Sequence, residues 1–295
     1  MSVPLMAQQT IALLHKPVRE LPRSIKASNA TDTELHFEVV RGMIYLQAQL
    51  DEESALFVFD TGAPTLVLNE SKPEQQGADL SAYSCTGELA VGSRRVSSFS
   101  WGSQTHRELA ALTVDLSHLG QAEQRPRGLI GYELFKSRIL CIDYQSKTLS
   151  LLNRRQWKRF QENAEPIARF SFELYGHLPV IKLRTEPQTY RFGIDTGAAA
   201  NLISPAALAD FSYRESSEPR EALQGLDQQV QMVEAVELLK LWPTQTAAHR
   251  FLLTDLSAIT ANSEWELDGL LGYEFLSRYR VVIDYPRREL SIWPL

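Results

Sequence analysis

The sequence has few of the residues that build disulfide frameworks and zinc sites. Its 295 residues include only two cysteines, Cys85 and Cys141, which are too few for a disulfide framework. Neither cysteine has a partner at the spacing of metal ligands, and the six histidines are scattered along the chain. We therefore expect no metal and no cofactor.

Long apolar runs and an excess of positive charge are missing too. No stretch reaches the roughly 18 apolar residues of a membrane-spanning helix, so no transmembrane segment is expected. The net charge of −6 argues against a nucleic-acid partner, because sequence-independent binding needs a basic surface. Apolar residues at 44% and charged residues at 22% are typical of a globular protein.

The start of the chain gives little information about location. Residues 1–7 are apolar but lack the basic start and the full-length apolar segment of a signal peptide. Residues 4–8 could be the remnant of one, which favours a periplasmic or secreted location over a cytoplasmic one and leaves the compartment open. We assign residues 1–30 to an N-terminal extension.

What the sequence does contain is an internal repeat. Residues 57–63 (FVFDTGA) return as residues 192–198 (FGIDTGA), and residues 128–133 (GLIGYE) return as residues 269–274 (GLLGYE). Three shorter matches keep the same order: Asp-Leu-Ser from 115 and 255, Ile-Asp-Tyr from 142 and 283, and Leu-Ser from 149 and 290. Matches in a constant order predict two homologous units, residues 31–155 and 166–295, joined by a linker at 156–165.

Each unit has the patterns of a β protein. Residues 44–50 alternate apolar with other side chains, and residues 56–59 form a continuous apolar run that ends at Asp-Thr-Gly, which predicts a strand buried on both faces. Residues 132–135 and 273–276 are good helix formers and predict short helices. Hairpins are expected over residues 139–152 and 281–293, and a short linking helix over residues 153–160.

The repeated motif resembles the active-site motif of the pepsin and retropepsin group of aspartic peptidases. Each Asp-Thr-Gly ends an apolar strand, is followed by Ala, and is answered downstream by two apolar residues and a glycine, Gly131 or Gly272. The resemblance covers nearly the whole chain beyond residue 35. It implies an all-β, bilobal acid-protease fold with two pseudo-twofold-related β-barrel lobes and short helices. Retroviral enzymes pair two identical chains, whereas this chain looks like a bacterial-type single chain with both halves in tandem, so a monomer is expected.

The resemblance also implies the site. Asp60 and Asp195 would be the catalytic pair of an endopeptidase that acts on a peptide or protein substrate. Two carboxyl groups held about 3 Å apart share one proton, so one can activate a water while the other donates to the scissile carbonyl. The supporting residues would be Thr61, Gly62, Ala63, Thr196, Gly197, Ala198, Gly131 and Gly272.

One departure from the family pattern bears on pH, and one feature of the family bears on access. Ala63 and Ala198 stand where pepsin-like enzymes often carry Ser or Thr, so fewer donors stabilise the ionised pair and we expect a mildly acidic optimum. The family covers its cleft with β-hairpin flaps, for which Gly87 and Gly225 are the candidates.

Other interpretations stay open. The same fold could be a catalytically inactive peptide-binding or inhibitor-like module, or a processing enzyme with a single partner. The repeated aspartates at 143 and 284 and at 115 and 255 are interpreted as structural turn residues. The arginines of residues 125–127 and the basic cluster of residues 154–159 are interpreted as solvated surface.

Overall fold

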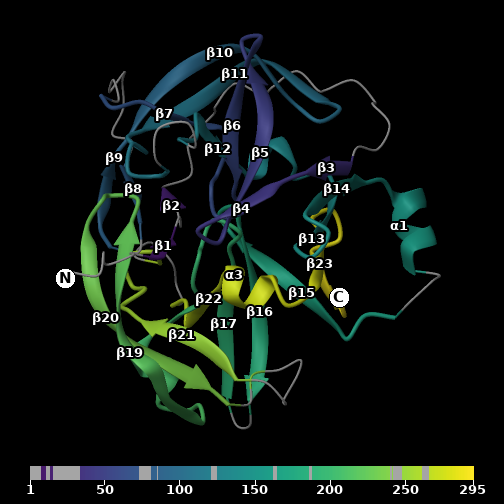
Figure 1. The fold of residues 1–295 in the computed structure, drawn as a ribbon. Helices are drawn as coiled ribbons and strands as arrows, with labels where there is room; N and C mark the ends of the chain where they lie inside the picture. Colours follow the sequence, from purple (N-terminus) through teal and green to yellow (C-terminus); the bar gives the residue numbers. More distant parts are fainter. Residues whose placement is uncertain are drawn as a thin grey trace.

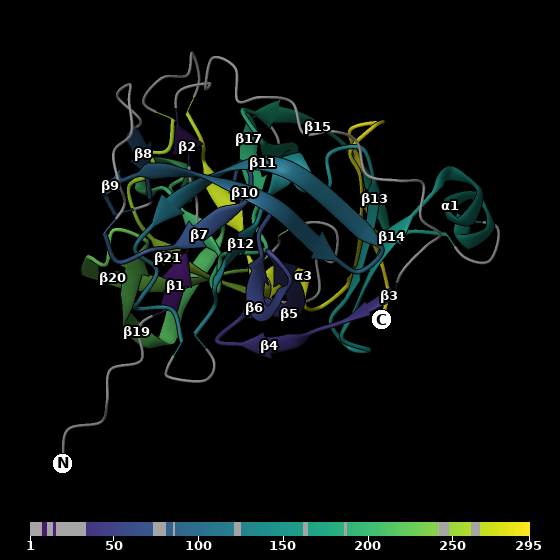
Figure 2. The same cartoon turned by 90° about the horizontal axis from the view of Figure 1, so that it is seen from above.

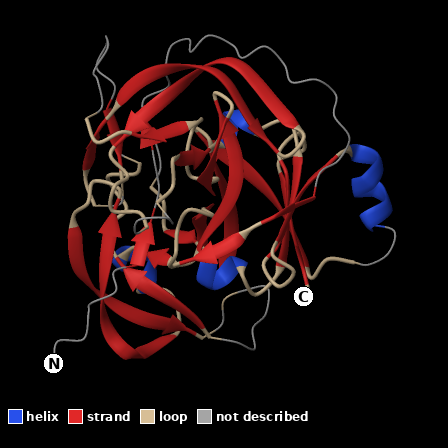
Figure 3. Cartoon of the chain, turned by 45° about the horizontal axis from the view of Figure 1, so that its top comes forward, coloured by secondary structure: helices blue, strands red, loops and turns tan. Residues whose placement is uncertain are grey.

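The computed structural model describes the chain in eleven segments, which exclude most of the N-terminal extension. They are residues 8–10, 14–15, 34–72, 81–84, 86–120, 125–161, 165–185, 188–239, 241, 248–260 and 266–295. Cys85 lies outside them. Strands make up most of the described chain and helices are few and short (Figure 3), so the all-β prediction is confirmed.

The first part of the chain forms a seven-stranded sheet in the order β10-β11-β7-β12-β6-β5-β4. A further pairing of β10 with β5, which joins Phe99 to Leu50, closes six of these strands into a barrel. The strands are β4 (Glu38–Val40), β5 (Met43–Leu50), β6 (Glu53–Phe59), β7 (Val67–Asn69), β10 (Gly92–Trp101), β11 (Gln104–Val114) and β12 (Gly128–Ile130).

A fourteen-stranded sheet contains most of the remaining strands, in the order β1-β19-β20-β21-β18-β22-β17-β16-β15-β24-β23-β13-β14-β3. They are β1 (Gln8–Thr10), β3 (Glu34–His36), β13 (Ile139–Asp143), β14 (Thr148–Leu152), β15 (Ala168–Tyr175), β16 (Leu178–Thr185), β17 (Gln188–Ile194), β18 (Leu202–Ile203), β19 (Tyr213–Gly225), β20 (Val230–Leu238), β21 (His249–Leu253), β22 (Gly269–Leu271), β23 (Arg280–Asp284) and β24 (Glu289–Trp293).

A small third sheet joins the N-terminal extension to the first part of the chain. In it, β2 (Leu14–His15) pairs with β8 (Ser81–Tyr83), which pairs with β9 (Glu88–Ala90). Because β1 pairs in parallel with β19, the extension adds one strand to each of two hairpins, β8–β9 and β19–β20. In Figure 1, β1 and β2 lie between these hairpins.

The helices follow the sequence patterns. A 3₁₀ turn, η2 (Tyr132–Leu134), and α3 (Tyr273–Leu276) come directly after Gly131 and Gly272. Helix α1 (Arg154–Gln161) stands at the edge of the molecule (Figure 2), with Trp157 as its buried residue, and α2 (Pro205–Leu208) is a single turn capped by Ser204. The described helices include none with the length and apolar character of a membrane span.

One apolar core runs through both parts of the chain. It includes Phe57 and Phe59 of β6 and Phe192 and Ile194 of β17, all fully buried. This burial on both faces is what the apolar runs before each Asp-Thr-Gly predict. The two aspartates therefore stand at strand ends that the core holds firmly in place.

Candidate active site

Each aspartate comes at the end of a buried strand that has a short parallel neighbour. Strand β12 pairs with the end of β6, and β22 pairs with the end of β17. The backbone of Asp60 continues the first pairing by donating to the carbonyl of Ile130 at 3.1 Å, and Asp195 donates to Leu271 at 3.1 Å. The two aspartates thus have the same local backbone support.

The glycines after the apolar pairs lie directly behind the two loops. A Cβ on Gly131 would lie 2.3 Å from the carbonyl oxygen of Thr65, and a Cβ on Gly272 would lie 2.4 Å from that of Ala200. Neither position has room for a side chain.

The residues that directly follow Gly131 and Gly272 bind the alanines of the motif. The backbone N–H of Tyr132 donates to the carbonyl of Ala63 at 2.9 Å, and that of Tyr273 donates to Ala198 at 2.8 Å. The apolar-apolar-Gly segments therefore fix the shape of the two Asp-Thr-Gly loops.

The two threonines link the loops to each other. Thr61 Oγ1 donates to the carbonyl of Ile194 at 2.9 Å and accepts from Thr196 N at 3.0 Å. Thr196 Oγ1 donates to Phe59 O at 3.1 Å and accepts from Thr61 N at 3.0 Å. These four buried hydrogen bonds fix the distance between the two loops, which come from distant parts of the sequence.

The carboxyl groups meet in the middle of this frame. Gly62 N donates to Asp60 Oδ1 at 2.7 Å, and Gly197 N donates to Asp195 Oδ1 at 2.8 Å. A Cβ on Gly197 would lie 2.6 Å from Asp60 Oδ1, so the Asp60 carboxyl rests on the opposite loop. Both aspartates have an exposed fraction of 0%.

The surroundings favour the protonated form of both acids. Burial raises the pKa of Asp60 well above its ordinary value, and the charge of Asp195 raises it further, while N–H donation from Gly62 opposes the rise. Burial raises the pKa of Asp195 from 3.8 to about 7 against donation from Gly197. Each Oδ2 is buried without a donor among the described residues, and each acid affects the pKa of the other. One proton shared between them satisfies this arrangement.

The hairpins at Gly87 and Gly225 touch each other. Gly87 lies in the β8–β9 turn, whereas Gly225 is the last residue of β19 and the turn itself is residues 226–229. Ser84 Oγ donates to Asp227 Oδ1 at 3.0 Å, and Thr86 Oγ1 donates to the same oxygen. Gly225 is needed for close approach, because an added Cβ would collide with the Thr86 hydroxyl. The two hairpins are joined in this structure.

Three residues of this region have no counterpart in the sequence predictions. His177 Nε2 lies 2.6 Å from the carbonyl oxygen of Gly62. Asn201 Oδ1 accepts from Gly272 N at 2.9 Å, and its amide donates to Arg250 O at 2.9 Å. Asp227 makes the contact between hairpins. The position of Asn201, six residues after Asp195 in an otherwise apolar segment, is the one sequence signal that points to any of them.

The other repeated aspartates have the structural roles expected of them. Asp143 accepts from the backbone N–H groups of Gln145 and Ser146 and pairs with Arg280 at 2.7 Å. Asp284 accepts from Arg287 N at 3.0 Å. Asp115 and Asp255 accept from the backbone two residues ahead. All four organise turns.

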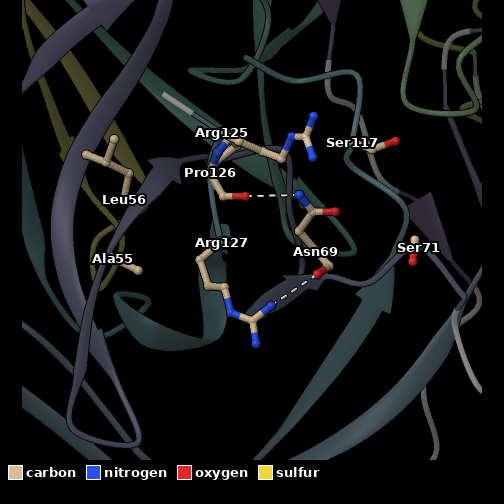
Figure 4. Close-up of a pocket in the computed structure, with 8 residues that line it drawn as sticks. All are labelled: Ala55, Leu56, Asn69, Ser71, Ser117, Arg125, Pro126 and Arg127. Atoms are coloured by element: carbon tan, nitrogen blue, oxygen red, sulfur yellow. Dashed lines mark hydrogen bonds between the residues drawn. The ribbon is translucent and has the colours of Figure 1, made fainter. Parts of the chain in front are cut away.

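Residues 125–127 include two exposed arginines, as predicted. They line an open pocket of about 460 Å³ together with Ala55, Leu56, Asn69, Ser71 and Ser117 (Figure 4). The buried Pro126 accepts from Asn69 Nδ2 at 3.0 Å, and Arg127 donates to the Asn69 carbonyl at 3.4 Å. The pocket lies at the start of β6, whereas Asp60 follows its end, so the pocket and the aspartate pair are separate places.

Comparisons with protein-family models and with curated protein sequences gave no match. The described ranges hold no group of three His, Cys, Asp or Glu side chains that could bind a metal ion. The geometry of the paired aspartates is therefore the feature that bears on function.

Proposed function

We propose that this chain is an aspartic endopeptidase built on a bilobal acid-protease fold, with Asp60 and Asp195 as its catalytic pair. The observation that carries the proposal is the buried pair of carboxyl groups, which two loops from distant parts of the sequence present to each other. Four threonine bonds hold the loops at a fixed separation. A structural aspartate at a strand end needs none of this cross-linking.

The proposed chemistry uses one shared proton. The ionised carboxyl takes a proton from a water held between the two acids, and the water oxygen attacks the scissile carbonyl carbon. The protonated carboxyl donates to the carbonyl oxygen. When the tetrahedral intermediate collapses, the carboxyl that took the proton of the water donates it to the leaving amine, and the other carboxylate recovers a proton from a hydroxyl group of the intermediate. No covalent bond to the protein forms. The raised pKa of Asp195, about 7, supports a pair that holds its proton at mildly acidic pH.

The proposed substrate is an extended segment of peptide or protein. Strands β8 and β19 both accept an additional strand from the N-terminal extension. Their edges can therefore recognise the backbone of an extended chain through main-chain hydrogen bonds.

One observation favours a second candidate, an inactive module that binds peptides. Both aspartates are fully buried, and the hairpins are joined through Asp227, so a substrate reaches the carboxyl groups only after the structure around them opens. A protein that has lost turnover can keep such a closed arrangement.

Digestion of a broad peptide library across a range of pH tests the proposal. We expect cleavage by the wild-type chain and none by Asp60→Asn or Asp195→Asn. Asp255→Asn is the matched control, because it removes a turn carboxylate and should leave cleavage unchanged. Circular dichroism should show that all three variants fold. Binding without any cut would support the inactive module, and cleavage that survives either active-site change would reject the mechanism.

A further inference from the structure

The loop that carries Asp60 receives a hydrogen bond from a side chain outside the Asp-Thr-Gly motif. His177 Nε2 lies 2.6 Å from the carbonyl oxygen of Gly62. A carbonyl oxygen can only accept, so this ring nitrogen carries a hydrogen and donates it. The side chain of His177 is buried, with 6% exposed.

The corresponding position beside the other loop is Gly42. Tyr45 pairs with Val58, two residues before Asp60, and Val180 pairs with Gly193, two residues before Asp195. Counting back three residues from Tyr45 and Val180 along β5 and β16 gives Gly42 and His177.

Gly42 cannot offer an equivalent donor. Its φ is +79°, and a Cβ there would lie 2.9 Å from the Cα atom of Ala199. The loop of Asp195 thus has a residue without a side chain next to it, where the loop of Asp60 has an imidazole. Since the threonine and glycine bonds match in the two loops, the His177 bond is a difference between otherwise similar surroundings.

The bond acts on the peptide units next to the Asp60 carboxyl. Gly62 donates its N–H to Asp60 Oδ1 at 2.7 Å. The peptide unit that contains the Gly62 carbonyl also contains the N–H of Ala63, a second donor that lowers the pKa of Asp60. Donation to a peptide carbonyl polarises the N–H of the same unit and strengthens its own hydrogen bond.

We propose that His177 is a positioning residue of this site. It holds the Gly62 peptide so that the N–H groups of the first loop point to Asp60, and it thereby makes the surroundings of the two aspartates unequal. The inference rests on the proposed peptidase function. It assigns His177 no contact with the substrate. A dyad that shares one proton needs one acid and one base, and unequal surroundings favour one distribution of those roles.

The test compares two substitutions at this position in the full chain. His177→Leu fills the space without a donor, and His177→Gln keeps an N–H at a similar reach. We expect the Leu variant to lower kcat by roughly tenfold to a hundredfold with little change in KM. We also expect the acid limb of its pH–rate profile to move to higher pH. The Gln variant should keep most of the wild-type kcat and a pH–rate profile close to that of the wild type. His249→Leu is the matched control, because His249 is equally buried and belongs to β21, outside the two loops.

A second measurement does not require activity. The carboxyl chemical shifts of labelled aspartate, assigned through Asp60→Asn and Asp195→Asn, report the titration of the pair. We expect the apparent pKa of the pair to rise by about half a unit or more in the Leu variant and to stay near wild type in the Gln variant. A shifted titration in a protein that cleaves nothing would keep the positioning role and reject the peptidase.

Two outcomes overturn the proposal. A folded Leu variant with unchanged kcat and unchanged titration would show that His177 only fills space. A Gln variant as impaired as the Leu variant would show that the donated hydrogen is not what the site uses.

Discussion

At the scale of single residues, the site depends on groups whose partners come from the opposite loop. Thr61 and Thr196 each donate one bond and accept one across the centre of the molecule. Their hydroxyl groups are buried, so a lost partner is not replaced by water. The threonines therefore stabilise the fold by joining the two loops.

Replacing either threonine by valine should be costly. Thr61→Val leaves the carbonyl of Ile194 and the N–H of Thr196 without their partner, and we expect a loss of about 2–4 kcal/mol of unfolding free energy. Urea unfolding measures it. Thr113→Val is the matched control, because Thr113 Oγ1 is also buried but has no hydrogen-bond partner among the described residues. Equal losses in the two variants would contradict the account.

The raised pKa values predict how stability depends on pH. Burial raises the pKa of Asp195 from 3.8 to about 7, so between these values the folded state binds more protons than the unfolded state. The resulting stabilisation is present below about pH 4 and is lost as pH rises through about 7, with a slope of about 1.4 kcal/mol per pH unit for one proton.

The measurement is the unfolding free energy from about pH 4 to about pH 7. The double variant Asp60→Asn/Asp195→Asn should lose this part of the pH dependence, whereas Asp255→Asn should keep it. The same slope in wild type and double variant would show that the pair does not hold a raised proton affinity.

The repeated motif predicts the candidate site residues that are close together in the sequence. It does not predict those that only the fold brings to the site. Asp60 and Asp195 are marked by their repeated surroundings, and Gly131 and Gly272 by the apolar pair before them. His177 is a lone histidine in a turn, and only the register of β16 against β17 brings it to Gly62. Asp227 likewise needs two hairpins from distant segments to meet.

At the scale of elements, the N-terminal strands and the two hairpins form a connected unit. Strand β1 lies along β19 with Thr10 opposite Gly225, and β2 lies along β8 with Leu14 opposite Tyr83. These are the edges that the proposed function assigns to the substrate backbone. The extension and a substrate would therefore compete for the same hydrogen-bonding groups.

Removing the extension should increase activity. A chain that starts at residue 16 lacks both strands, and we expect its kcat/KM on a library-derived peptide to rise several-fold through a lower KM, because the hairpin edges become free. A chain that starts at residue 8 keeps both strands and is the control. Equal kcat/KM values for the two truncations would mean that the strands do not obstruct the substrate.

The patterns predicted the local elements better than their partners. The apolar run before each aspartate, the helices after the glycines and the hairpins near residues 139–152 and 281–293 are all confirmed. Strands β1 and β2 were not predicted, since two or three residues carry no periodicity. Gly225 was placed at a hairpin tip, whereas it ends a strand and allows close contact with Thr86.

At the scale of the whole molecule, the ends of the chain share one sheet. The C-terminal strands β23 and β24 lie between β13 and β15, and β23 pairs with β13 over the full length of both strands. The sequence gives the two hairpins but not this pairing, because strand partners distant in sequence leave no local pattern.

A truncation tests how far the fold depends on these strands. A chain that ends at residue 279 lacks β23 and β24, so β13 and β15 each lose one of their two neighbours. We expect it to lose the cooperative unfolding transition of the full chain, as measured by circular dichroism during heating. A cooperative transition close to that of the full chain would show that the rest folds alone.

Strand β24 lies inside the fourteen-stranded sheet, between β15 and β23. Its synthesis therefore limits when the two aspartates can come together. The chain leaves the ribosome from its N-terminus, and β24, which ends at Trp293, is made after all the other described strands. Asp60 therefore emerges long before the strands that complete its frame. A growing chain would therefore carry the two aspartate loops in an unassembled state until β24 takes its place in the sheet.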